Sequence, residues 1–224
     1  MFEARWLNCN EPEMMLRYML GKTGDRKLRL FACACVRRVW SMLRDERSRV
    51  AVQVAEEYAD RPVGFTRLSP VRAAARSAGQ WLDAVASRGE SDDGGSAVWA
   101  ARAAAATVED TGWDVARNAA TAVARARNAS RLQERRAQCD LLRDAFRNPF
   151  RALALNPAWL HWHEGCVVTM ARTIYEERRF EEMPILADAL EEAGCEDEEI
   201  LWHCRVDSPH ARGCWLLDAI LGRK

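Results

Sequence analysis

The sequence predicts an all-α protein, an irregular bundle of about eight to ten helices without a significant β-sheet. Apolar residues recur at steps of three and four positions through most of the chain, which places them on one face of a helix. Capping residues and prolines mark helix starts, and glycines mark helix ends. β-Branched residues never alternate for long enough to indicate a strand.

The first part of the chain, residues 1–60, predicts a unit of three helices. Pro12 opens the first of them, and Gly21 ends it, because glycine is the preferred residue just past a helix end. Asp45 is a good N-cap for the third helix, which ends near Asp60.

The second helix of this unit has the clearest pattern. Asp25 is its expected N-cap, and the apolar spacing continues to about Leu43. Charged residues occupy the opposite face. We therefore expect the apolar face of this helix, which includes Phe31, Val39 and Trp40, to lie in the core.

The middle part, residues 61–148, is dominated by alanine and arginine and also predicts helices. Alanine favours the helix and allows close approach between helices, but it offers little apolar area per residue. The segment 89–96, GESDDGGS, is the one polar loop in which we expect flexibility.

The last part, residues 149–224, predicts a longer helix followed by three short ones. Asn156-Pro157 starts a turn rich in aromatic residues, Pro184 marks a helix start, and acidic residues 196–199 suit the beginning of another helix. Ser208-Pro209 repeats the cap and proline pattern before the final helix. We expect the three parts of the chain to form one continuous globular domain.

Composition restricts where such a chain would be found. With 224 residues, of which 49% are hydrophobic, it can bury a core without disulfide bonds. No apolar stretch is long enough to span a membrane, and the start of the chain carries too much charge for a signal peptide. The eight cysteines are therefore expected to be reduced thiols in a cytoplasmic protein.

Two blocks near the ends of the chain carry a family resemblance. They are GKTGDRKLRLFACACVRRVW over residues 21–40, and MPILADALEEAGC over 183–195 with HCR and PHARGCWLLDAILG after it. Together they resemble a large family of bacterial proteins that share both blocks around a variable, alanine-rich middle. The resemblance implies the boundaries given above. It implies no activity, cofactor or catalytic residue.

Cysteines and histidines near the C-terminus form a candidate metal site. Cys195, His203, His210 and Cys214 are spaced C-x7-H-x6-H-x3-C, and two cysteines with two histidines suit tetrahedral zinc. The spacing matches no standard zinc finger. The simpler interpretation is buried thiols beside partly exposed histidines, without a cofactor, and structural zinc is the alternative. His161 and His163 form a weaker pair, because residues two apart on a helix do not face each other.

Basic residues near the start of the chain form a candidate binding surface for a partner or a nucleic acid. The whole-chain pI of about 6.9 and the interspersed acids argue against a phosphate-backbone binder. The helical region 26–49 nevertheless supports nucleic-acid binding as an alternative. The residues that would carry it are Arg26, Lys27, Arg37, Arg38 and Arg44.

No motif for a nucleophile, a phosphate-binding loop or a catalytic metal is present in the sequence. Our first hypothesis is therefore a non-enzymatic helical interaction module, or a subunit of a larger assembly, whose partner is another protein. A nucleic-acid-associated accessory protein is the alternative, and an enzyme is the third hypothesis. The oligomeric state is left open.

Overall fold

The computed structural model describes residues 1–61, 68–89, 95–127 and 130–223. Of the described residues, 74% are helical; they form ten helices of seven or more residues and contain no strand. The predicted all-α class is therefore confirmed. Most of the loop expected at 89–96 falls on residues 90–94, which lie outside the described residues.

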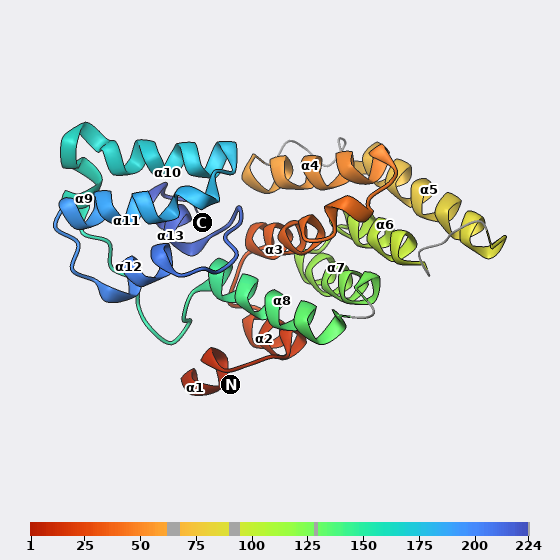
Figure 1. Cartoon of the computed structure of the whole chain (residues 1–224), viewed down its shortest axis with the longest axis horizontal. Coiled ribbons are helices and arrows are strands. Elements are labelled where there is room, and N and C mark those ends of the chain that lie inside the picture. Colours follow the sequence, from red (N-terminus) through yellow and green to blue (C-terminus); the bar gives the residue numbers. More distant parts are fainter. Residues whose placement is uncertain (62–67, 90–94, 128–129, 224) are drawn as a thin grey trace.

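In Figure 1, α9 to α13 lie together at one end of the molecule, α5 lies at the other end, and α3, α7 and α8 lie between them. None of the helices in the described ranges combines the length and apolar character needed to cross a membrane. Their bounds are α1 (Glu3–Leu7), α2 (Pro12–Met19), α3 (Asp25–Arg37), η1 (Trp40–Met42), α4 (Glu46–Asp60), α5 (Leu68–Ser87), α6 (Ser96–Ala106), α7 (Gly112–Ala126), α8 (Arg131–Phe146), α9 (Pro157–His161), η4 (Trp162–Gly165), α10 (Cys166–Glu177), η5 (Phe180–Glu182), α11 (Met183–Glu192), α12 (Glu198–Arg205) and α13 (Trp215–Ile220).

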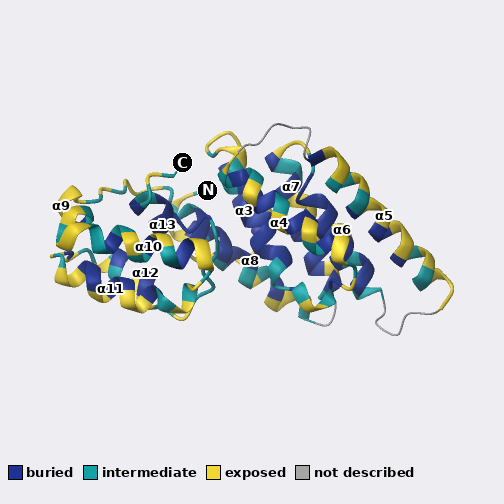
Figure 2. Cartoon of the chain, turned by 90° about the horizontal axis from the view of Figure 1, so that it is seen from above, coloured by how far each residue is buried: buried dark blue, intermediate teal, exposed yellow. Residues whose placement is uncertain are grey.

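Within the described residues, the helices enclose two large hydrophobic cores and a small third cluster of Leu82, Val98 and Ala101. The first core runs from Trp6 to Leu142, so residues 1–60 and the alanine-rich middle share it. The second core begins at Trp159 and is built by α9 to α13. Figure 2 shows the buried faces of each half turned inward. The chain passes from one half to the other after α8.

Small residues set the spacing of the central helices in the first core. All the alanines of α6 and α7 are buried; α7 packs closely on both α6 and α3, and α6 packs also on α5. Where α7 begins, a Cβ atom on Gly112 would lie 2.8 Å from the Cα of Asp25. Any larger residue there would push α7 away from α3.

The helix expected from Asp25 to about Leu43 ends earlier than predicted. Gly24 is its N-cap, α3 stops at Arg37, and a short 3-10 turn follows. Asp45 then starts α4 by accepting the Arg47 N–H at 2.9 Å, so the chain must turn before it. Region 26–49 is thus two helices. Phe31 and Val39 are buried as expected, whereas Trp40 is only partly buried.

Charged side chains join the two cores. Asp218 of α13 is buried and pairs with Arg26 at 2.7 Å and Lys27 at 2.6 Å, both from α3. The Tyr175 hydroxyl of α10 donates to Asp60 of α4 at 2.9 Å. These contacts fix the C-terminal half against α3 and α4.

Candidate metal centre

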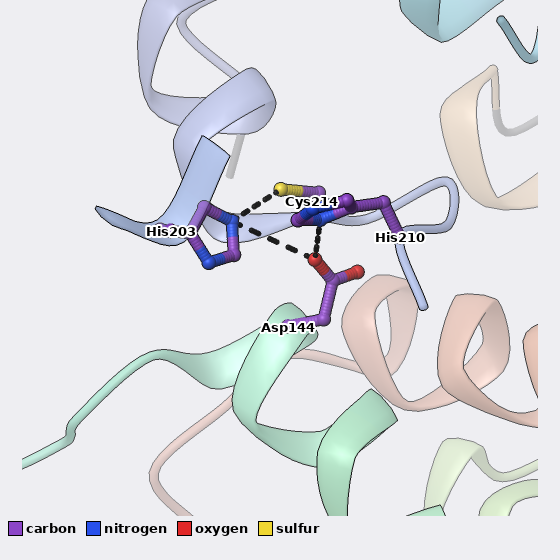
Figure 3. Close-up of side chains that lie close together, drawn as sticks. All are labelled: Asp144, His203, His210 and Cys214. Carbon is purple, nitrogen blue, oxygen red and sulfur yellow. Dashed lines mark hydrogen bonds and ion pairs between the residues drawn. The ribbon is translucent and has the colours of Figure 1, made fainter. Parts of the chain in front are cut away.

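Four side chains from three parts of the chain meet between the two cores (Figure 3). Asp144 comes from the last turn of α8, and His203 comes from α12. His210 and Cys214 come from the irregular segment that joins α12 to α13. The site therefore combines one residue of the first half with three of the second.

The segment before α13 is not the helix start predicted at Ser208-Pro209. The final helix begins at Trp215 instead, with Cys214 as its N-cap. The preceding residues wrap around Asp144, whose Oδ2 atom accepts the Ala211 N–H at 3.1 Å. Because this backbone group bonds to a side chain, the segment does not continue as a helix.

Lys27 holds the two sides of the site together. Its ammonium group donates to the carbonyl oxygen of Ala145 at 3.0 Å and to that of Gly213 at 2.8 Å. These residues directly adjoin Asp144 and Cys214. A charged hydrogen bond of this kind stabilises its acceptor more than a neutral one does, so Lys27 positions both segments.

The four candidate ligand atoms lie within 4.8 Å of one another. His203 Nε2 is 3.1 Å from Cys214 Sγ and 3.6 Å from Asp144 Oδ1, which is 2.8 Å from His210 Nδ1. Tetrahedral zinc, with bonds of about 2.0–2.3 Å, separates neighbouring ligand atoms by about 3.3–3.7 Å. The cluster is thus close to the size that a zinc ion requires.

The site is shielded from water. Cys214 is fully buried, and the side chains of Asp144 and His210 are 4% and 5% exposed. A buried carboxylate needs a compensating positive charge, and the side chains nearest to Asp144 are two histidines, which are charged only when protonated. A bound cation would supply that charge directly.

Burial also controls protonation in the cluster. Burial lowers the pKa of His203 to about 4, although the negative charge of Asp144 acts to raise it. This imidazole is therefore neutral near pH 7. Burial and the nearby Asp144 raise the pKa of the Cys214 thiol well above its ordinary value. Without a metal, Cys214 is therefore a neutral thiol.

One nitrogen atom in the cluster lacks a partner. His210 Nε2 is buried and makes no hydrogen bond, although its other nitrogen contacts Asp144. Buried polar atoms are nearly always paired, so an unpaired one requires a reason. A metal ion bound through this nitrogen would provide it, but the ring would first have to turn, because Nδ1 is the atom that faces Asp144.

Trp215 determines the tautomer of His203. The indole Nε1–H, which can only donate, lies 3.3 Å from His203 Nδ1. Nδ1 therefore accepts, and the proton of the neutral ring is on Nε2, facing Cys214 Sγ. Binding a metal through Nε2 requires this proton to leave and the contact with the indole to change.

The structure brings together three of the four residues expected at a metal site. His203, His210 and Cys214 are in the cluster, but Cys195 is not. Its backbone N–H caps α11 by donating to the Leu190 carbonyl oxygen at 2.9 Å, and its side chain packs into the second core. Asp144 takes the fourth position. Among the described residues, no other group of three or more possible metal ligands comes together, so His161 and His163 belong to no such group.

The basic residues expected at a nucleic-acid surface are mostly paired inside the chain. Arg26 and Lys27 contact Asp218, as described above. Arg37 pairs with Glu56 at 2.7 Å, and Arg38 pairs with Glu134 at 3.1 Å, both with buried acids. Arg44 is exposed. Four of the five residues therefore stabilise contacts between helices.

Comparisons of the chain with protein-family models, with curated proteins and with solved structures found no match. The function must therefore be argued from the residues of the chain itself.

Proposed function

We propose that the protein is a non-catalytic helical scaffold that binds another protein, and that a zinc ion joins its two cores. The ligands would be Asp144, His203, His210 and Cys214. The observation that carries the proposal is the convergence of these four side chains at one buried point between the halves of the molecule.

The chemistry of the four residues favours zinc over other ions. Two imidazoles, one thiolate and one carboxylate are borderline ligands that suit zinc, whereas magnesium and calcium prefer oxygen atoms alone. Once Cys214 and Asp144 are ionised, their two negative charges balance the two positive charges of the ion. The site would then be neutral, which its burial requires.

The same arrangement favours a structural role over a catalytic one. Four protein ligands close a tetrahedral site, whereas catalytic zinc keeps one position open for water. Cys214 and His203 also resemble a nucleophile and base pair. The thiol is fully buried, however, and its raised pKa keeps it protonated, so it lacks the properties of a reactive cysteine.

The nucleic-acid alternative has less support than the protein partner. Its basic residues would have to leave internal carboxylates in order to contact phosphate.

All eight cysteines are free thiols. A reducing compartment such as the cytoplasm is therefore part of the proposal.

Metal analysis of the purified full-length chain tests the zinc joint. We expect about one zinc ion per chain by elemental analysis and native mass spectrometry. The Asp144→Asn and Cys214→Ser variants should lose the ion, whereas the matched Cys195→Ser variant should keep it. Absence of zinc from the wild-type chain after expression and purification with added zinc would refute the proposal.

A further inference from the structure

A cavity of about 390 Å³ adjoins the candidate metal centre. It lies between α1, the end of α8 and α12, and His203, Asp144 and Trp215 form part of its wall. Trp202 and Leu7 also line it, and they are 66% and 49% exposed. Large apolar side chains are therefore presented to solvent beside an existing hollow, as in many binding sites.

The charges of this cavity favour a cationic occupant. Its lining has four carboxylates and two guanidinium groups, which leaves an excess of two negative charges. If Asp144 is bound to zinc, three carboxylates still oppose the two arginines. Asp207 is exposed and has no ion pair among the residues of the described ranges. It is therefore available to a positive group.

The two arginines of the cavity are already engaged, which argues against an anionic occupant. Arg143 donates to Asp140 at 2.8 Å and to the Cys9 carbonyl oxygen at 2.6 Å. Arg147 binds both carboxylate oxygens of Glu199, at 2.9 and 2.7 Å. An anion would have to displace these contacts.

Arg147 also shows how the wall of the cavity binds a cation. Its guanidinium carbon lies 5.1 Å from the ring centre of Trp215, while Glu199 holds its nitrogen atoms. An indole face with a carboxylate beside it attracts a cation strongly. Trp202 and Asp207 offer the same two groups at the exposed side of the cavity.

We propose that this cavity docks an arginine or lysine side chain from a basic segment of another polypeptide. The cation would stack on Trp202 and pair with Asp207, and its aliphatic stem would lie against Leu7 and Val206. Acidic residues 196–199, at the start of α12, would attract the rest of the segment. This inference rests on the proposed role as a protein-binding scaffold, whose partner it specifies.

Fluorescence anisotropy with the full-length chain tests the docking site. The probe is a labelled, acetylated hexapeptide of arginine, and a hexapeptide of glutamate is the negative control. We expect Trp202→Ala to weaken binding about fivefold or more, and Asp207→Asn about threefold. Trp81→Ala, which removes another exposed indole, and Glu192→Gln, which removes another exposed acid, should bind like the wild type.

Three outcomes would overturn the inference. The first is equal binding by the wild type and both cavity variants, and the second is equal binding of the glutamate peptide. The third is competition by N-acetylarginine amide as strong as that of the hexapeptide, which would indicate a small-molecule site. Zinc content, measured on the same samples, separates this result from the zinc proposal: loss of binding in the cavity variants supports docking whether or not zinc is present.

Discussion

Asp144 Oδ1 lies 2.8 Å from His210 Nδ1, although 66 positions separate these residues in the sequence. Asp144 belongs to a helix of the first core, and His210 belongs to the segment that leads into the last helix of the second. The contact therefore reports on how the two halves dock. Changes at this point should affect the junction more than either core.

Zinc removal should destabilise the wild type but not a variant without the site. A ligand at several hundred times its Kd stabilises a protein by about 3–4 kcal/mol, so Cys214→Ser should lower the free energy of unfolding by about that amount. Chelator should lower the unfolding free energy of the wild type to that of Cys214→Ser. It should leave the unfolding free energy of the variant unchanged. Cys195→Ser, also a buried thiol, should keep its response to chelator. Thermal and urea unfolding would measure these effects.

Replacing Trp215 should strengthen zinc binding. When a metal occupies His203 Nε2, the proton moves to Nδ1 and faces the indole N–H, so two donors oppose each other. Trp215→Phe removes this conflict, worth about 1 kcal/mol, and should raise zinc affinity about fivefold in competition with a chromophoric chelator. Trp202→Phe, at an exposed indole, should have no effect. Unchanged affinity in Trp215→Phe would show that His203 Nε2 is not a ligand.

The buried ion pairs between α3 and α13 should matter more than surface pairs. Asp218→Asn leaves Arg26 and Lys27 without their shared carboxylate, and loss of one partner of a buried pair costs about 3–5 kcal/mol. Asp188→Asn breaks an exposed pair with Arg205 and should cost less than about 1 kcal/mol. Urea unfolding followed by circular dichroism compares the two variants. Equal losses would mean that the junction does not depend on Asp218.

Burial distinguishes two aromatic residues that the sequence places on the same helix face. Phe31 is 1% exposed, so Phe31→Ala should cost about 3–5 kcal/mol. Trp40 lies in the 3-10 turn, partly buried, with the Arg37 guanidinium 4.6 Å from its ring centre. Trp40→Ala should cost only about 1–2 kcal/mol, because less apolar area is lost. The reverse order in urea unfolding would contradict the assignment of the core.

The sequence predicts features that depend on neighbouring residues. Asp45 accepts a backbone N–H group at a helix start as expected, because a cap acts over two or three positions. Asn156, where the sequence predicts only a turn, also accepts such a group and caps α9. The sequence does not predict the early end of α3, because no glycine or proline marks it. The apparent helix start at Ser208-Pro209 was wrong because Ala211 bonds to Asp144, a residue far away in the sequence.

The same dependence on neighbouring residues explains which members of the candidate site the sequence predicts. His203, His210 and Cys214 were predicted together because short segments connect them. The sequence does not predict Asp144 as a ligand, because it is far from the other three residues in the chain. Its one distinguishing feature is a position beside Leu141 and Ala145 on the buried side of α8. The sequence pattern predicts Arg26 on a surface, because its partner Asp218 is 192 positions away. Periodicity shows which face a residue occupies but not which distant side chain it meets.

The separation of the hydrophobic cores has a consequence for engineering. A backbone break between Pro149 and Asn156 would yield two fragments, each with a complete set of the helices that enclose one core. Arg26 and Lys27 would lie on one fragment and Asp218 on the other, so these ion pairs would form again when the fragments associate. With one proposed metal ligand on one fragment and three on the other, the pair would form a split reporter whose complementation responds to metal if the site binds it.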